Sequence, residues 1–383
     1  MTAQLPQATR IVKHSLQLWS ADTVTTFDRT GRFVRLVKGS QVVRRKLNGH
    51  LVRVTEVNRE NHSRIYEAVA EEEANSIVEA VYKSLDTAAK PTDELAAEWL
   101  RRARAWTPET LKADGEKFSQ AYLPVSILPP GEYQSVVVQI TEGCSYNRCR
   151  FCDFYRNRPF HVKNETQLRG HLHQIRELFG LRLQDRTGFF LGDGNALVIA
   201  PNRLQSAMAV TVQELPEVPA QFSIFMDTFN MGNKLTEDLQ ELRRHGLETV
   251  YVGLESGYNP MRELLRKPGT GAQAAQSIVR LKEAGFRIGV MVMVGMGHGE
   301  LAGQHLAHTR EILESIPLDA RDMIFVSPFV EPEDSPDWPQ LKAELQSVVS
   351  YSQRLTEAQR WIHLLNRTLP AKVTLYSVLE HLY

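Results

Sequence analysis

Six short, continuously apolar runs separated by segments of helical spacing dominate the chain between residues 135 and 330. The runs cover residues 135–141, 188–193, 221–227, 249–255, 287–295 and 322–330. Strands buried on both faces of a parallel sheet have this character, because helices cover both sides of such a sheet. Repeated strand–helix units imply right-handed crossovers, and hence an α/β fold built as an open or closed β/α barrel. A doubly wound sheet is the alternative. In either fold, chemistry belongs to the loops at the carboxyl ends of the strands.

The first third of the chain has a different pattern. Residues 24–57 alternate β-branched runs with turn residues, as a small antiparallel meander does. Helical spacing follows from Ile65 to Leu85, around 95–104, and over 108–122. Prolines and a glycine between 124 and 131 then interrupt regular structure. We therefore predict an N-terminal α+β extension over residues 1–130 and a barrel over 131–332.

A helical extension is predicted over residues 333–383. After a proline-rich turn, an apolar face made by Leu341, Leu345, Val348 and Leu355 indicates a helix. Such a helix either covers one mouth of the barrel or lengthens the core at the side or bottom of the barrel. The sequence leaves both alternatives open.

Only three cysteines occur in the chain, and they lie together at Cys144, Cys149 and Cys152. An odd, clustered set is not a disulfide framework, and the first residues contain no long apolar run of a signal peptide. We expect a reducing compartment and a cytoplasmic protein. No apolar segment is long enough to span a bilayer. The formal net charge is +0, so the chain has no global field for nucleic acid or an anionic membrane.

Three thiols in one loop suggest a metal centre. Thiolates select zinc, copper(I) and iron–sulfur clusters. A structural zinc site needs a fourth ligand, which would be His161, His171, His173 or a residue distant in sequence. A [4Fe–4S] cluster held by three cysteines instead leaves one iron without a protein ligand. Three incidental buried thiols are the remaining alternative.

The loop "CSYNRCRFC" directly follows the first predicted barrel strand and has an aromatic residue, Phe151, before its last cysteine. It resembles the radical S-adenosylmethionine (radical SAM) superfamily over about residues 133–330. That family usually has C-x3-C-x2-C spacing, whereas this chain has C-x4-C-x2-C. The resemblance implies a partial (β/α)6 barrel, a [4Fe–4S] cluster on Cys144, Cys149 and Cys152, and SAM as cofactor. It also implies an external one-electron reductant of the flavodoxin or ferredoxin type.

Later strand ends carry motifs that strengthen this resemblance. "LGDGNAL" places Gly192 and Gly194 around Asp193, and is similar to the family's glycine-rich turn that meets the amino group of SAM. Glycines let a backbone approach a ligand closely, and a carboxylate suits an ammonium. "GLESG" is similar to the family's ribose-contacting segment, which implies that Glu255 and Ser256 bind the sugar hydroxyls.

The fifth strand ends in "VGMGHGE", which resembles the family segment whose backbone lies against adenine, with Gly295 and Gly297 flanking the turn. The implied reaction is the reductive cleavage of SAM to methionine and a 5′-deoxyadenosyl radical, which abstracts hydrogen from a bound substrate. The residues that act on that substrate are unknown from the sequence.

The substrate is indicated only indirectly. No cysteine remains for a second cysteine-ligated cluster. The cofactor segments resemble the group that includes the coproporphyrinogen dehydrogenases and several tRNA-modifying enzymes. Two groups of cations allow two interpretations each: the basic residues of the meander, and Arg156 and Arg158 after the cysteines. In one interpretation they bind an anionic ligand, and in the other they are exposed to water. We predict a small-molecule substrate. RNA modification is one alternative, and a non-enzymatic zinc or iron–sulfur electron-transfer module is another.

Overall fold

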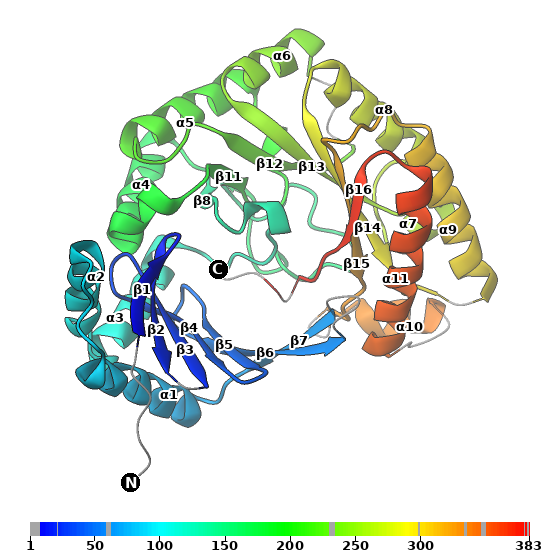
Figure 1. Ribbon diagram of the computed structural model, residues 1–383. Helices are drawn as coiled ribbons and strands as arrows, with labels where there is room; N and C mark the ends of the chain where they lie inside the picture. Colours follow the sequence, from blue (N-terminus) through cyan, green and yellow to red (C-terminus); the bar gives the residue numbers. More distant parts are fainter. Residues whose placement is uncertain are drawn as a thin grey trace. The chain divides into compact units, whose positions relative to one another are not determined.

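A computed structural model describes residues 8–20, 22–58, 63–229, 234–297, 299–332, 335–345, 350–378, 380 and 383. The chain divides into two compact units (Figure 1). The N-terminal unit comprises Met1–Val125, His173–Arg186 and Leu379–Tyr383. The barrel unit comprises Ser126–Leu172 and Thr187–Val378. Each unit contains its own 7-stranded sheet.

The sheet of the N-terminal unit is an antiparallel meander in which each strand pairs with the next along the chain. Its strands are β1 (Ala8–Val12), β2 (Ser15–Ser20), β3 (Thr23–Asp28), β4 (Phe33–Lys38), β5 (Gln41–Arg45), β6 (Leu51–Asn58) and β7 (Ser63–Ala68). Gly31, Gly39 and Gly49 follow strands and have positive φ, which glycine adopts without steric cost. The meander predicted over 24–57 is thus the middle of a larger sheet.

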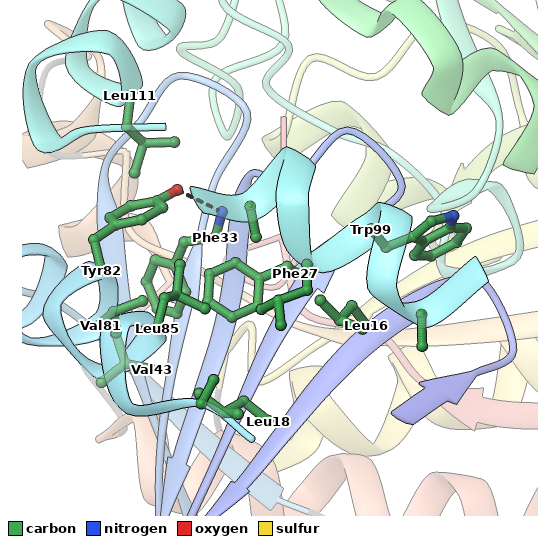
Figure 2. Close-up of a cluster of buried hydrophobic side chains, with 14 of the residues drawn as sticks. Leu16, Leu18, Phe27, Phe33, Val43, Val81, Tyr82, Leu85, Trp99 and Leu111 are labelled. Atoms are coloured by element: carbon green, nitrogen blue, oxygen red, sulfur yellow. Dashed lines mark hydrogen bonds between the residues drawn. The ribbon is translucent and has the colours of Figure 1, made fainter. Parts of the chain in front are cut away.

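Helices α1 (Glu71–Ser84), α2 (Glu94–Arg104) and α3 (Pro108–Ala121) supply the apolar partners for one face of this sheet. Figure 2 shows side chains of this core, including Leu16, Phe27, Phe33, Tyr82, Leu85, Trp99 and Leu111. The backbone N–H of Phe33 donates to the Tyr82 hydroxyl at 3.1 Å. The prediction that the first helix begins at Ile65 was wrong. Ile65 lies in β7 and pairs with Thr55, and the helix begins at Glu71.

The barrel unit is built on a parallel sheet, which confirms the predicted fold class (Figure 1). Its spatial order is β16-β15-β14-β13-β12-β11-β8. The strands are β8 (Val136–Gln139), β11 (Phe189–Gly192), β12 (Phe222–Met226), β13 (Leu247–Glu255), β14 (Arg287–Val294), β15 (Met323–Pro328) and β16 (Lys372–Leu375). Strands β8 and β16 are the two edges, so the barrel is open. Five of the six predicted apolar runs contain one of these strands, and the run 249–255 covers all of β13 except its first two residues.

Helices lie around the outside of this sheet in Figure 1. They are α4 (Glu165–Phe179), α5 (Pro201–Glu214), α6 (Thr236–Arg244), α7 (Asn259–Leu264), α8 (Gly271–Glu283), α9 (Gly299–Glu314), α10 (Trp338–Glu344) and α11 (Tyr351–Thr368). The 3₁₀ turns are η1 (Leu85–Thr87), η2 (Pro130–Glu132), η3 (Gly180–Asp185) and η4 (Ala196–Val198). In the described part of the chain, no helix is long and apolar enough to cross a membrane.

The C-terminal extension differs from a single helix. Leu341 belongs to α10 and Leu345 ends it, whereas Leu355 belongs to α11. Val348 lies outside the described residues. Helix α11 contacts β14, β15 and β16 and connects the last two, so it is a crossover helix at the side of the sheet. The sequence did not predict β16, which adds a seventh parallel strand.

Candidate functional site

The three cysteines lie on a loop that begins beside the carboxyl end of β8. Strands β9 (Thr141–Glu142) and β10 (His161–Val162) pair antiparallel and close the base of this loop, residues 143–160. We call it the cysteine loop. Arg156 Nε donates to the Cys152 carbonyl at 3.1 Å, and its Nη2 donates to the Cys149 carbonyl at 2.8 Å. Arg156, for which the sequence left an anionic ligand and water as alternatives, therefore binds the loop's own backbone.

The Asp193 carboxylate joins both ends of the cysteine loop. It accepts from the Gly143 backbone N–H at 3.0 Å, from Arg158 Nη1 at 2.7 Å and from Gln139 Nε2 at 3.1 Å. Burial raises the pKa of Asp193, and Arg158 opposes that shift. The predicted contact between Asp193 and the SAM amino group stays a prediction. In this structure the carboxylate is bonded to these three donors.

The glycines beside Asp193 allow close packing against the cysteine loop. The Gly192 carbonyl accepts from the Thr141 hydroxyl at 3.0 Å. A Cβ on Gly194 would lie 2.6 Å from the Tyr155 ring and 3.2 Å from Cys144 Cβ. The absence of a side chain at Gly194 thus allows Cys144 to pack next to the end of β11. Any larger residue would displace the loop.

A buried group of charges, Asp227, Glu255 and Lys267, lies at the carboxyl ends of β12 and β13. Lys267 Nζ is 3.6 Å from Asp227 Oδ1 and 3.7 Å from Glu255 Oε1. Burial would lower the pKa of Lys267, but the two carboxylates outweigh it and the pKa is raised. Burial raises the pKa of Glu255, and Lys267 opposes it. Among the described residues, Asp227 Oδ1 has no hydrogen-bond partner.

This group of charges lies next to the cysteines. The Cys149 thiol interacts electrostatically with Lys267, Asp227 and Glu255. The loop is held there because Arg150 donates from its backbone N–H to the Leu265 carbonyl at 3.0 Å. The Tyr146 hydroxyl likewise donates to the Arg266 carbonyl at 2.9 Å. Lys267 was not predicted as a site residue from the sequence, because it follows a short helix and belongs to no motif.

Asp227 and Asn195 were also missed as site residues. The fully buried Asn195 accepts from the Asp227 backbone N–H at 2.9 Å and donates to the Ser145 hydroxyl at 3.1 Å. It therefore connects the cysteine loop to the end of β12. Asp227 is the last residue of a predicted apolar run, and this polar strand end was a sign that could have identified it.

Ser256 lies beside Glu255, but its hydroxyl is directed into the protein. Ser256 Oγ is 2.8 Å from His305 Nδ1 and accepts from the Tyr258 backbone N–H at 3.0 Å. His305 Nε2 is 2.8 Å from the Met293 carbonyl, which only accepts, so Nε2 carries the proton and Nδ1 is an acceptor. Burial lowers the pKa of His305 to about 4, which keeps the ring neutral. The predicted ribose contact of Ser256 stays a prediction.

The predicted adenine segment forms a tight turn after β14. Gly295 has φ 80° and Gly297 has φ 78°, a region that side chains disfavour. A Cβ on Gly295 would lie 2.4 Å from Arg354 Cγ. Nearby, Phe151 is partly buried against an apolar cluster. The buried members of that cluster are Met261, Leu265, Met293, Met296, Phe329, Trp338, Leu341 and Leu345.

The three thiols of the cysteine loop suit either an iron–sulfur cluster with one open iron or a zinc ion that takes a fourth ligand. Burial raises the pKa of the Cys149 and Cys152 thiols to about 12, so metal binding must release protons. Of the histidines considered as a fourth ligand, His161 is bonded to Gln167, and the buried His171 accepts from the Gln139 backbone N–H. Within the described ranges, which include the three cysteines, no group of three or more His, Cys, Asp or Glu side chains is placed to hold a metal ion.

Residues 138–307 match the family model of the Radical SAM superfamily. No curated protein matches the sequence. Solved structures with a similar fold include coproporphyrinogen III oxidase (HemN) from Escherichia coli, with 16% identity and a TM-score of 0.43, over 61% of this chain and 52% of that chain. Methylornithine synthase (PylB) has 13% identity and a TM-score of 0.42, over 77% of this chain and 81% of that one.

Elp3 from the archaeon Methanocaldococcus infernus, with an N-terminal deletion, has 11% identity and a TM-score of 0.42. The match covers 63% of this chain and 56% of that chain. The chain thus spans about half the length of the HemN and Elp3 chains.

Proposed function

Residues 138–307 belong to the Radical SAM superfamily, and from this premise we propose that the chain is a radical SAM enzyme that holds one [4Fe–4S] cluster on Cys144, Cys149 and Cys152 and cleaves SAM there. When bound, the cluster would supply the electron that cleaves the sulfonium to methionine and a 5′-deoxyadenosyl radical. One observation carries the proposal. All cysteines of the chain lie on one loop, beside the buried charges of Asp227, Glu255 and Lys267.

These charges suit the methionyl end of SAM, which has an ammonium and a carboxylate. The Lys267 ammonium is held between two carboxylates at more than hydrogen-bond distance, so it has donors to offer to a ligand carboxylate. Asp227 Oδ1 is an acceptor without a hydrogen-bond partner in the described structure, and we assign it to the ligand ammonium. Glu255 accepts from the ribose hydroxyls.

The opposite end of the nucleoside is assigned to the turn after β14. We assign the adenine edge to the backbone of the buried glycine turn at Gly295 and Gly297, and Phe151 with its apolar cluster supplies a dry wall. Gly194 places the β11 turn against Cys144, and Gly192 lies against Val137 and Gln139. Exclusion of water from this site protects the radical until it meets the substrate.

The substrate is proposed to be a small molecule. The formal net charge is +0, and the basic residues of the N-terminal sheet are partly engaged within the fold. Arg45 is buried and ion-paired with Asp114 at 3.4 Å, and Arg53 pairs with Glu73 at 2.5 Å. RNA binding needs many cations directed at phosphates. A flavodoxin- or ferredoxin-type protein would supply the electron.

Anaerobic reconstitution followed by metal analysis and reductive turnover tests this function. We expect about four irons per chain, and 5′-deoxyadenosine when SAM and dithionite are added. The Cys149→Ala variant should yield neither a stable cluster nor product. One zinc and no iron in the wild-type chain would identify a zinc module. A full cluster that neither binds nor cleaves SAM would identify an electron-transfer module.

A further inference from the structure

Arg262, in α7, is among the most buried charged residues of the barrel unit, with 1% of its surface exposed. A guanidinium has five N–H donors. Its Nε donates to the Gly269 carbonyl at 2.8 Å. Nη1 donates to the Leu254 carbonyl at 2.6 Å and to the Ser256 carbonyl at 3.1 Å. Nη2 donates to the Pro268 carbonyl at 2.7 Å and is 3.4 Å from the Thr228 hydroxyl. Every donor therefore has an acceptor within the protein.

These acceptors belong to the three segments that carry the buried charges. Thr228 follows Asp227, and Leu254 and Ser256 flank Glu255. Pro268 and Gly269 directly follow Lys267, whose backbone N–H donates to the Arg262 carbonyl at 2.7 Å. One side chain thus connects the ends of β12 and β13 to the loop after α7.

The backbone at Glu255 needs such support. Glu255 has φ 60°, a left-handed conformation that non-glycine residues adopt only where surrounding contacts hold them. The carbonyls on both sides of Glu255 accept from the same Arg262 nitrogen, which fixes the turn. A lysine in this place would offer three donors from one point and could not span these directions.

We infer that Arg262 is the positioning residue of the SAM site, and that it fixes Glu255 and Lys267 relative to each other without touching the ligand. With all its donors engaged in the protein, it has none to offer to SAM. This inference rests on the proposed function, because it assigns Arg262 to the SAM affinity of a chain that holds the cluster.

The Arg262→Lys variant tests the inference, with Arg262→Gln as a second variant. The matched control is Arg32→Lys, because Arg32 is also buried and donates to Asp114, Thr30 and the Leu178 carbonyl within the N-terminal unit. Iron content, thermal midpoint and the dissociation constant of SAM are measured on each reconstituted protein. For both Arg262 variants we expect about four irons per chain and SAM binding weakened by about ten-fold or more. Arg32→Lys should lower the thermal midpoint and leave SAM affinity unchanged.

Wild-type SAM affinity in both Arg262 variants would overturn the inference. Loss of iron together with SAM binding, or loss of the folded state where Arg32→Lys remains folded, would also overturn it, because Arg262 would then serve general stability. A wild-type chain that holds the cluster and does not bind SAM would instead refute the proposed function.

Discussion

The ammonium of Lys267 is the residue-scale feature on which the SAM assignment depends most. It lies between Asp227 and Glu255 at 3.6 Å and 3.7 Å, and its side chain is 7% exposed. A buried cation in this position is costly unless charges compensate it. Asp227 and Glu255 supply this compensation, and we propose that the Lys267 ammonium they hold binds the SAM carboxylate.

Replacing Lys267 by methionine keeps the length of the side chain and removes the charge. We expect SAM affinity to fall by about ten-fold or more, as for a lost charge-assisted bond, while the chain keeps its iron. Lys282→Met is the matched control, because Lys282 is also buried and pairs with Asp319 at 2.9 Å and Asp322 at 2.6 Å. Equilibrium dialysis with SAM measures both. Equal SAM affinity in the two variants would contradict the assignment of Lys267.

His305 predicts a pH dependence of stability. Its pKa falls from 6.5 to about 4 on burial, so the unfolded chain binds more protons between those values. Stability is then fully present above the unfolded pKa and is lost as pH falls toward the folded pKa. From pH 7 to pH 5 this single group costs about 2 kcal/mol of unfolding free energy. The His305→Gln variant has no titrating group at this position, so its unfolding free energy should fall by about 2 kcal/mol less than that of the wild-type chain between pH 7 and pH 5. Chemical denaturation of the cluster-free chain at both pH values checks this, and identical losses would refute it.

At the scale of elements, the cysteine loop is held at its two ends by one carboxylate of the β11 turn. Asp193 accepts from Gly143 before the cysteines and from Arg158 after them. The four residues between Cys144 and Cys149 are accommodated by left-handed backbone at Asn147. Asn147, between the first two cysteines, has φ 48°, which asparagine tolerates, and its side chain donates to the Tyr155 carbonyl at 2.6 Å.

The Asp193→Asn variant tests this role of the β11 turn. The amide keeps the shape of the side chain but loses the charge opposite Arg158, so we expect the loop to loosen and the iron content to fall several-fold. Asp322→Asn is the control, because Asp322 is fully buried and bonded to Lys282 beside the amino end of β15. Iron per chain after gel filtration is the measurement. Full iron in Asp193→Asn would show that the charge is not needed to hold the loop.

Elements with a strong pattern were predictable from the sequence, whereas contacts between elements were not. Continuous apolar runs identified β8 and β11 to β15, because strands buried on both faces leave no polar residues in the pattern. The four residues of β16 are too short for such a pattern. Ile65 fits a helical spacing, yet pairing with β6 places it in a strand. Lys267 and Arg262 derive their roles from neighbours that are distant along the chain or across the sheet, and no local pattern shows such neighbours.

At the scale of the whole molecule, the choice between a small substrate and RNA depends on cations of the N-terminal sheet. Arg35 and Arg44 are direct cross-strand neighbours. Burial lowers the pKa of Arg35, and the positive charge of Arg44 lowers it further. We expect tRNA binding by the chain to be weak, without a steep salt dependence, and unchanged in an Arg35→Glu/Arg44→Glu variant. Filter binding at low and moderate salt measures this. Tight, salt-sensitive binding that the double variant loses would move the protein to RNA modification.

The central proposal is that the methionyl carboxylate of SAM, which we assign to Lys267, also binds the iron that the three cysteines would leave open. Electron–nuclear double resonance on the reduced, reconstituted protein with SAM labelled by ¹⁷O in its carboxylate measures this contact directly. The account predicts a ¹⁷O hyperfine coupling to the cluster in the wild-type chain. A reduced [4Fe–4S] signal that shows no coupling at saturating labelled SAM would contradict it.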